Sequence, residues 1–329
     1  MRRKYLSNNK CFCNFLVQNL LSISYSNGSI YYKASFVLWG ASRMAKLDIL
    51  FLQSYSMTGH DVVSQLLQLT EDNLNEYIFE LYSENSPLNN LGFINKGSDK
   101  VTISIPESNI DLNVRQSISQ LSSKQTTSTT GYICWNTSIH VVDWLLSPLC
   151  PFKLFKSHVV LELGSGVGGI CASTLSKLVG HFIATDQKHI LKLLKENITD
   201  NVLNYKSSTL PSTSQNSNVT IDVIEFDWEE LHVGCFNLDS LKVQLVDVIL
   251  ACDTIYNEYL IGPFINTLKK LLHANAYALV AIQLRDAVTI ERFVTELVQS
   301  EGLSAYVVPP NLLTRGLKSG YQIYYVTKI

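Results

Sequence analysis

The chain has 329 residues, of which 46% are hydrophobic and 16% are charged, with 26 lysines and arginines against 28 aspartates and glutamates. This length is enough for one or two domains with a sizeable core. No uninterrupted apolar run reaches the roughly 20 residues that a membrane span needs, so we expect no membrane partner. The first 43 residues carry six basic residues and no acid, whereas the other 286 carry 20 basic and 28 acidic ones. This acidic body argues against a nucleic-acid partner, which requires a basic face.

Residues 1–43 form a basic extension rich in Ser and Asn, and the sequence leaves its status open. The extension is similar to a transit peptide, and it matches a secretory signal less well because Asn14, Gln18 and Asn19 interrupt the apolar stretch. Translation that begins at Met44 is the plainer alternative. The seven cysteines include no C-x-x-C pair. Such an unpatterned set is typical of reduced thiols, so we expect a cytoplasmic protein.

Two regions of different composition precede the main domain. Apolar residues recur at helical spacing between Asp48 and Tyr82, so we predict a small helical region over residues 44–84. Residues 85–130 are rich in Ser, Thr, Asn and Gln and predict a polar linker, with a possible strand at 101–105. The main domain then occupies residues 131–329.

A helix is predicted over about residues 137–146, at the start of the main domain. Trp135 precedes this helix. Its indole either covers a ligand cleft or packs in the core, and the sequence does not separate these alternatives.

The most informative segment is an apolar run over residues 159–163 that contains Glu162 and leads into Gly164, Ser165 and Gly166. Glycines at such a strand-to-helix turn let a ligand lie against bare backbone amides. The spacing also fits the G-x-G-x-x-G pattern of dinucleotide sites. However, a carboxylate at the turn repels a pyrophosphate and attracts the sulfonium and ammonium of S-adenosylmethionine. We therefore predict S-adenosylmethionine, rather than NAD, as the cofactor.

Three further strand-like segments each end next to an acid: the apolar runs 181–185 and 246–252 precede Asp186 and Asp253, and residues 219–226, which alternate like a strand, precede Asp227. Near-continuous apolar runs are typical of strands buried on both faces of a parallel sheet. Because the carboxyl ends of parallel strands meet at one edge, we expect these acids and Gly164 to converge there. The sequence therefore predicts one ligand site built from four strand ends.

Two of these acids suit parts of a nucleoside. A carboxylate at Asp186 is placed to accept hydrogen bonds from both ribose hydroxyls, although it is also a candidate cap of the next helix. Asp227 and Trp228 offer an acceptor for the exocyclic amine of adenine and a flat apolar face for its ring. A turn acid followed by a core tryptophan is the alternative for this second pair.

The segment Asp253-Thr254-Ile255-Tyr256 follows the fourth strand. Together with the glycine turn, it resembles the Asp-x-x-Tyr motif of the seven-strand methyltransferases directed at lysine. Within that group the chain is similar to the eukaryotic elongation factor 2 lysine methyltransferases. The matching segments are residues 129–135, 142–144, 160–166, 226–228 and 285–302.

The resemblance implies a Rossmann-like α/β fold whose seven strands follow the order 3-2-1-4-5-7-6, with strand 7 antiparallel. Strand 5 then corresponds to residues 276–284, and a closing pair corresponds to 304–308 and 321–328. The implied activity is transfer of a methyl group from S-adenosylmethionine to a lysine of elongation factor 2. We also expect a monomer and no metal ion. The implied donor-site residues are Trp135, Glu162, Gly164, Ser165, Gly166, Asp186, Asp227, Trp228 and, next to Asp253, Cys252.

The resemblance also assigns catalytic roles to Asp253 and Tyr256. Asp253 is expected to accept a hydrogen bond from the substrate amine, and Tyr256 to pack on the lysine stem. A helix cap at Asp253 and simple packing of Tyr256 are the alternative. The motif lacks the Pro-Pro pair typical of enzymes that methylate adenine in nucleic acid.

Three other functions stay open at this point. They are a lysine methyltransferase of the same group with a different protein substrate, a non-catalytic binding module on this fold, and an NAD-dependent oxidoreductase.

Overall fold

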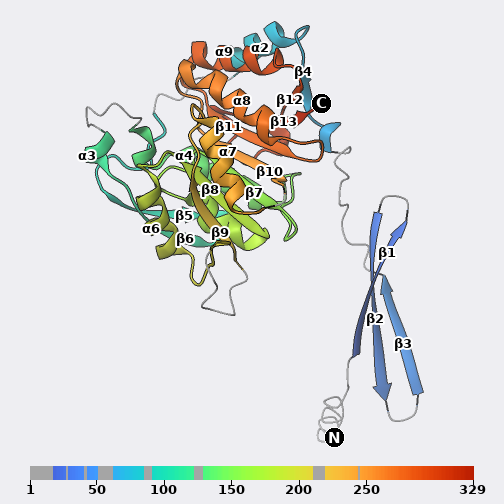
Figure 1. Ribbon diagram of the computed structural model, residues 1–329. Coiled ribbons are helices and arrows are strands. Elements are labelled where there is room, and N and C mark those ends of the chain that lie inside the picture. The colour runs from blue at the N-terminus through green and yellow to red at the C-terminus, as the bar shows by residue number, and fades with distance from the viewer. Residues whose placement is uncertain are drawn as a thin grey trace, which may run out of the picture. The chain divides into compact units, whose positions relative to one another are not determined.

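The computed structural model describes residues 18–26, 29–40, 43–50, 62–84, 91–121, 129–209, 219–243 and 245–329. The chain divides into two compact units at residues 62 and 63. In the first unit, β1 (Gln18–Ser26), β2 (Ser29–Gly40) and β3 (Arg43–Leu50) form an antiparallel sheet (Figure 1). Residues 1–17, 27–28 and 41–42 of the predicted extension lie outside the described residues.

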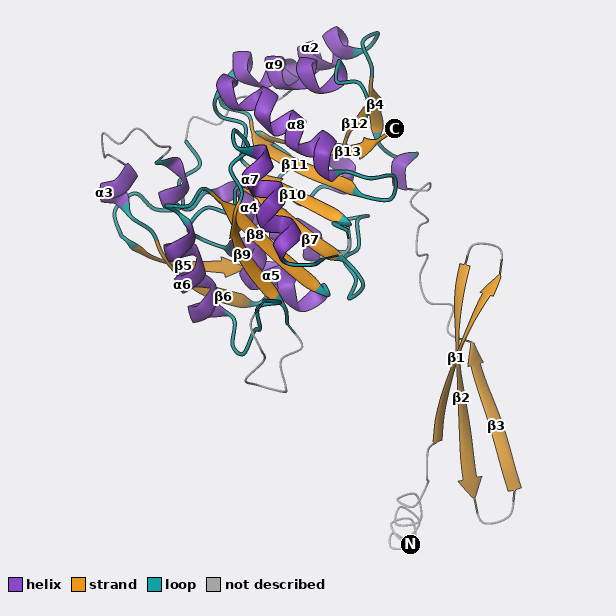
Figure 2. Ribbon diagram, viewed as in Figure 1, coloured by secondary structure: helices purple, strands orange, loops and turns teal. Residues whose placement is uncertain are grey.

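The second unit is built around an eight-stranded sheet with helices on both faces (Figure 2). Its strands are β4 (Leu67–Leu69), β7 (Val159–Leu163), β8 (His181–Asp186), β9 (Ile221–Glu225), β10 (Val248–Cys252), β11 (Tyr277–Gln283), β12 (Leu303–Val307) and β13 (Tyr321–Lys328). Its helices of ten or more residues are α2 (Leu74–Glu84), α4 (Asn136–Leu146), α6 (Leu191–Asn201), α7 (Leu231–Ser240), α8 (Ile261–Leu271) and α9 (Ala287–Val298). The shorter helices are α3 (Ile118–Leu121) and α5 (Ile170–Leu175).

The strands follow the order β4-β12-β13-β11-β10-β7-β8-β9. The five from β11 to β9 are parallel, and β13 is antiparallel to its neighbours β11 and β12. The predicted α/β class and the antiparallel β13 are therefore confirmed. The predicted number of strands is wrong, because β4 pairs with β12 as an eighth strand at the edge, and the observed order differs from the prediction by this strand. With three residues, β4 is too short to show a strand periodicity in the sequence.

The prediction of a helical region at 44–84 is wrong for two of its described segments, because residues 44–50 belong to β3 and Leu67–Leu69 form β4. It is correct for α2 (Leu74–Glu84), and residues 51–61 lie outside the described residues. The apolar spacing that indicated one helix is divided between strands and a helix, because pairing with distant segments decides which form each part takes. Within the described residues, no helix is both long enough and apolar enough to cross a membrane.

Alternate residues of the central strands face opposite helical layers. Leu161 and Leu163 of β7 belong to one core cluster with Phe264 of α8 and with residues of α2, α7 and α9. Glu162 lies between them in the strand, so its side chain points to the other face, toward Cys171 of α5. The alternation of side chains along β7 thus places Glu162, the acid before the glycine turn, on the face of the sheet that α5 covers.

A second, two-stranded sheet forms where the sequence predicts a linker. β5 (Lys100–Ile105) and β6 (Ile110–Arg115) pair as an antiparallel hairpin, with alternate residues of β5 buried. The possible strand at 101–105 is correct, but the linker interpretation is wrong for residues 100–115. Residues 85–90 and 122–128 of that region lie outside the described residues.

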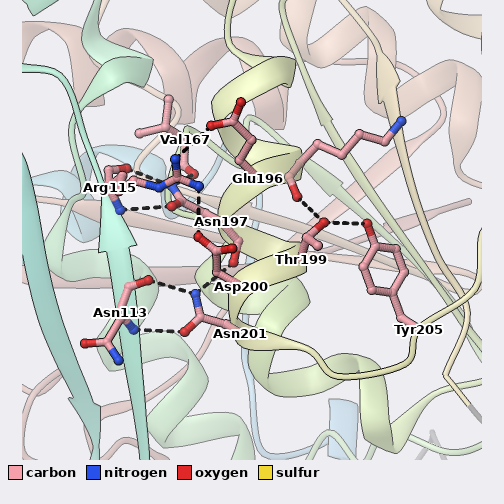
Figure 3. A network of polar contacts seen from close by, with 10 residues as sticks. Asn113, Arg115, Val167, Glu196, Asn197, Thr199, Asp200, Asn201 and Tyr205 are labelled. Atoms are coloured by element: carbon pink, nitrogen blue, oxygen red, sulfur yellow. Dashed lines mark hydrogen bonds and ion pairs between the residues drawn. The ribbon is translucent and has the colours of Figure 1, made fainter.

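Side-chain amides of α6 hold the outer edge of this hairpin (Figure 3). Asn197 Nδ2 donates to the carbonyls of Arg115 and Val167, at 2.7 Å each, and its Oδ1 accepts from the Arg115 N–H at 2.9 Å. One turn further along, Asn201 makes the same pair of bonds with Asn113, at 2.9 and 2.8 Å. Because Val167 follows the glycine turn, Asn197 joins α6, β6 and that turn.

Candidate active site

The turn after β7 brings three strand ends together. Gly164 has φ +73°, a left-handed conformation that favours glycine. A Cβ at this position would lie 3.0 Å from Thr254 Cγ2 and 3.4 Å from the ring of Trp228. Thr254 follows β10 and Trp228 follows β9, so the bare backbone of Gly164 lets both ends approach β7.

A chain of hydrogen bonds links the next two strand ends. The Asp186 carboxylate accepts from the N–H groups of Gly166 and Gln187, both at 2.8 Å. Gln187 Nε2 donates to Asp227 at 2.8 Å. The structure therefore places Gly166, Asp186 and Asp227 in one network, and Gln187, which the sequence analysis missed, is its bridge.

The environment of Asp186 bears on its two predicted roles. Burial raises the pKa of this carboxyl to about 6, although the two amide hydrogen bonds act in the opposite direction. The alternative of a helix cap is wrong, because α6 begins at Leu191 and Ile190 occupies its N-cap position.

Glu162 is more deeply placed than the sequence predicted. Its side chain is buried, and its carboxylate accepts a hydrogen bond from Ser165 Oγ at 2.8 Å. Burial raises its pKa to about 7, against the effect of hydrogen bonds from Cys171 and Ser165. Cys252 lies in the same buried group, with its Sγ 4.0 Å from that of Cys171. Glu162 and Cys252 therefore lie in the core behind the turn, and Glu162 reaches the turn through Ser165.

The Asp253 side chain is paired with an arginine of the same chain. Its carboxylate forms an ion pair with Arg285, which lies two residues after the end of β11. The Asp253 side chain is 2% exposed, and its backbone has φ +61°. Burial raises the pKa of Asp253, and the guanidinium of Arg285 opposes this shift. The sequence predicted that this carboxylate faces the substrate amine, whereas the structure pairs it with Arg285.

Tyr256 and Trp135 lie on either side of one short segment. Thr130 Oγ1 donates to the Tyr256 hydroxyl at 2.9 Å, and Trp135 Nε1 donates to the carbonyl of Thr130 at 3.1 Å. The Gly131 carbonyl accepts from the N–H of Val167 at 2.8 Å. Residues 130–135 thus connect the glycine turn to Tyr256, a residue that is 40% exposed.

Sequence reasoning missed Thr130 and Arg285 as parts of this site. Arg285 had a usable signal, because it follows the fifth strand of the domain as Asp186, Asp227 and Asp253 follow the others. Thr130 had none, since it lies in a Ser- and Thr-rich stretch.

The site contains buried polar atoms that a ligand would satisfy. Ten buried side-chain polar atoms of the described residues have no hydrogen-bond partner, and three of them, Trp228 Nε1, Asp253 Oδ1 and Thr254 Oγ1, belong to residues at the strand ends of this site. The side chains of Trp228 and Thr254 line the bare backbone of Gly164. Buried polar atoms in native proteins normally have partners, so their clustering at a glycine turn fits a bound molecule with polar groups. Trp228 also packs edge-on against Phe264, at 5.1 Å between ring centroids, which fixes the indole plane.

The sheet with helices on both faces, a glycine turn and acids at successive strand ends defines an α/β protein of the doubly wound class, in which ligands bind at this edge of the sheet. The profile of a family described as lysine methyltransferase matches residues 115–300. The chain belongs to this lysine methyltransferase family.

Curated relatives from two yeasts are similar over nearly their whole length. Ribosomal lysine N-methyltransferase 5 of Vanderwaltozyma polyspora is 32% identical over 324 residues, which cover 79% of this chain and 100% of the relative. The protein of the same name from Lachancea thermotolerans is 28% identical over 335 residues, with 81% and 99% covered. Neither name refers to elongation factor 2, so these relatives do not support the substrate that the resemblance implied.

Proposed function

We propose that this protein transfers a methyl group from S-adenosylmethionine to a lysine of a ribosomal protein. The family match, together with relatives that the chain spans almost completely, carries the proposal. Charge supports the substrate class, because residues 44–329 contain 28 acids and 20 basic residues. An acidic enzyme attracts the basic surface that a protein bound to ribosomal RNA must present.

The residues at the glycine turn fit the proposed donor. The Asp186 oxygens each accept one amide bond and keep further lone pairs for the ribose hydroxyls. Asp227, held by Gln187, is available to the adenine amine. Trp228 Nε1 and Thr254 Oγ1 offer the polar contacts that the protein leaves unmade. When bound, S-adenosylmethionine supplies an electrophilic methyl group on its sulfonium.

The protein must orient a neutral lysine toward that methyl group. Free lysine has a pKa near 10.4, so the reactive amine is a minority form at neutral pH. The half-exposed ring of Tyr256, held by Thr130, offers a flat surface for the lysine stem. Correct orientation of the reacting groups supplies up to about 7–11 kcal/mol in well-oriented reactions, and Tyr256 is proposed to contribute to that orientation.

A radiolabel transfer assay tests this proposal. The full chain is incubated with methyl-labelled S-adenosylmethionine and, separately, with salt-washed ribosomal proteins and with purified elongation factor 2. We expect one labelled ribosomal protein, with the label on lysine after hydrolysis. Label on elongation factor 2 alone would overturn the ribosomal assignment, and the absence of label from every protein would overturn the activity.

Two matched variants connect the label to the site. Asp186→Asn removes a carboxylate at the glycine turn and should abolish the label together with donor binding. Asp239→Asn changes an exposed acid on α7 and should leave both unchanged.

A further inference from the structure

Arg285 is held in place by three different contacts. It forms the ion pair with Asp253, its Nε donates to Gln283 Oε1 at 3.1 Å, and its Cζ lies 4.9 Å from the centroid of the Trp135 ring. The Arg285 side chain is 18% exposed and that of Asp253 is 2% exposed. A guanidinium suits such a site because its planar fork pairs with a carboxylate while its face stacks on an aromatic ring.

The stack continues from Arg285 toward the surface. The Trp135 ring lies 4.6 Å from that of Phe93, with 28° between the planes, and Lys96 Nζ lies 4.5 Å from the Phe93 centroid. Trp135 also holds the carbonyl of Thr130, whose hydroxyl donates to Tyr256. Arg285 therefore contacts one residue of the Asp-x-x-Tyr motif directly and reaches the other through Trp135 and Thr130.

The ion pair changes what Asp253 can do for a substrate. A carboxylate without a partner beside a lysine stabilises the ammonium, which has no lone pair for attack. With Arg285 bound, the charge of Asp253 is compensated within the protein. Loss of one member of a buried pair is strongly unfavourable, so a substrate ammonium does not displace Arg285 easily.

We propose that Arg285 is a positioning residue of the methyl-transfer site, which holds Trp135 and keeps Asp253 from pairing with the substrate ammonium, so that lysine reacts in its neutral form. This inference rests on the proposed function.

Two titratable side chains next to the pair, Tyr321 and His140, stay neutral in the pH range of the test. Tyr321 of β13 has its pKa raised to about 12 by burial, with a further contribution from Asp253. His140 of α4 lies 5.2 Å from the Tyr321 ring, and burial lowers its pKa below 6.5. Both side chains are therefore neutral between about pH 7 and 10, where the substrate lysine loses its proton.

The test is the pH dependence of kcat and KM for the ribosomal substrate. Arg285→Gln should lower kcat at pH 7.5 by about tenfold, leave KM for the protein substrate unchanged or lower, and move the pH–rate profile up by about one unit, because the freed Asp253 retains the ammonium. Arg285→Lys, which keeps the charge, should restore the wild-type pH profile with a partial recovery of kcat.

The matched control is Arg292→Gln. Arg292 lies on α9, is half exposed and pairs with Glu258 and Glu296, so its loss should leave kcat, KM and the pH profile unchanged. If Arg285→Gln fails to fold, the double variant Asp253→Asn with Arg285→Gln restores a neutral pair. This double variant should fold and keep the wild-type pH profile.

The outcomes separate this inference from the proposed function. An active wild type in which Arg285→Gln loses kcat without a shift of the pH profile, or raises KM to the same extent, would overturn the inference alone. A wild type that transfers no methyl group would overturn the proposed function and this inference with it.

Discussion

The buried side chain of Asn197 makes three hydrogen bonds to backbone groups, and the free-energy cost of losing them can be worked out from the structure. Its side chain is fully buried, and it satisfies the N–H and the carbonyl of Arg115 and the carbonyl of Val167 (Figure 3). Asn197→Ala removes all three bonds at once and leaves three backbone groups without a partner. Each buried group left unsatisfied costs about 1–3 kcal/mol, and water entering the space offsets part of this. We expect the free energy of unfolding to fall by about 3–5 kcal/mol.

Asn201→Ala is the matched control. Asn201 makes the equivalent two bonds with Asn113 one helical turn away, and a third with the Asn197 carbonyl at 2.8 Å, but it is only partly buried and its two bonds with Asn113 are exposed. Water replaces the lost partner there, so we expect a cost of about 1 kcal/mol or less. The ion pairs of Arg115 with Glu196 and Asp200 are partly exposed and are expected to contribute little to either variant.

Equilibrium unfolding in urea measures the difference between the two variants. The m-value must stay constant for the midpoints to report stability. Hydrogen exchange adds a local readout, because the Arg115 N–H should lose protection in Asn197→Ala and keep it in Asn201→Ala. Equal costs for the two variants would refute the reasoning that burial makes the inner amide pair the stronger one.

Three further predictions concern the glycine turn and the two ends of the sheet. Burial raises the pKa of Glu162 to about 7, so binding of a cationic donor should release the proton of this carboxyl, and the donor should bind more tightly as the pH rises from about 6 to 8. Glu162→Gln should lose this pH dependence, and calorimetric titrations that show no pH effect in the wild type would contradict the prediction. Gly169→Ala should lower the free energy of unfolding by about 2–4 kcal/mol, because φ is +55° and the new Cβ would lie 2.8 Å from two side chains of α6. Gly302→Ala, with φ +84° but open space around the new Cβ, should lower it by about 1 kcal/mol in the same thermal unfolding assay. Burial of Asp222 acts to raise its pKa, but its hydrogen bonds, of which the one with His181 has the largest effect, lower the pKa to about 2. The folded pKa of Asp222 lies below the unfolded value of 3.8, so its contribution of about 2 kcal/mol to the free energy of unfolding is complete above pH 4 and is lost as the pH falls to 2. Asp222→Asn should unfold more easily at pH 7, and its stability should fall less steeply with decreasing pH than that of the wild type. Parallel falls of stability in acid for the two proteins would count against this role.

The sequence by itself determined the parallel core of the sheet. The strands β7, β8, β10 and β11 are apolar runs buried on both faces, a local property that is readable without knowledge of their partners. The glycine turn and the acids at successive strand ends are equally local. For this reason the predicted edge of the sheet contains most of the residues that the structure brings together.

Tertiary structure alone decided the parts that depend on distant partners. β4 is a strand only because β12, more than 230 residues later, offers it an edge. The β5–β6 hairpin has a polar composition that predicted a linker, and amides from α6 hold its edge. Arg285 finds its ion-pair partner, Asp253, at the neighbouring strand end. Hydrogen bonds and ion pairs between segments far apart in the chain leave no periodic pattern in either segment, so the sequence did not reveal them.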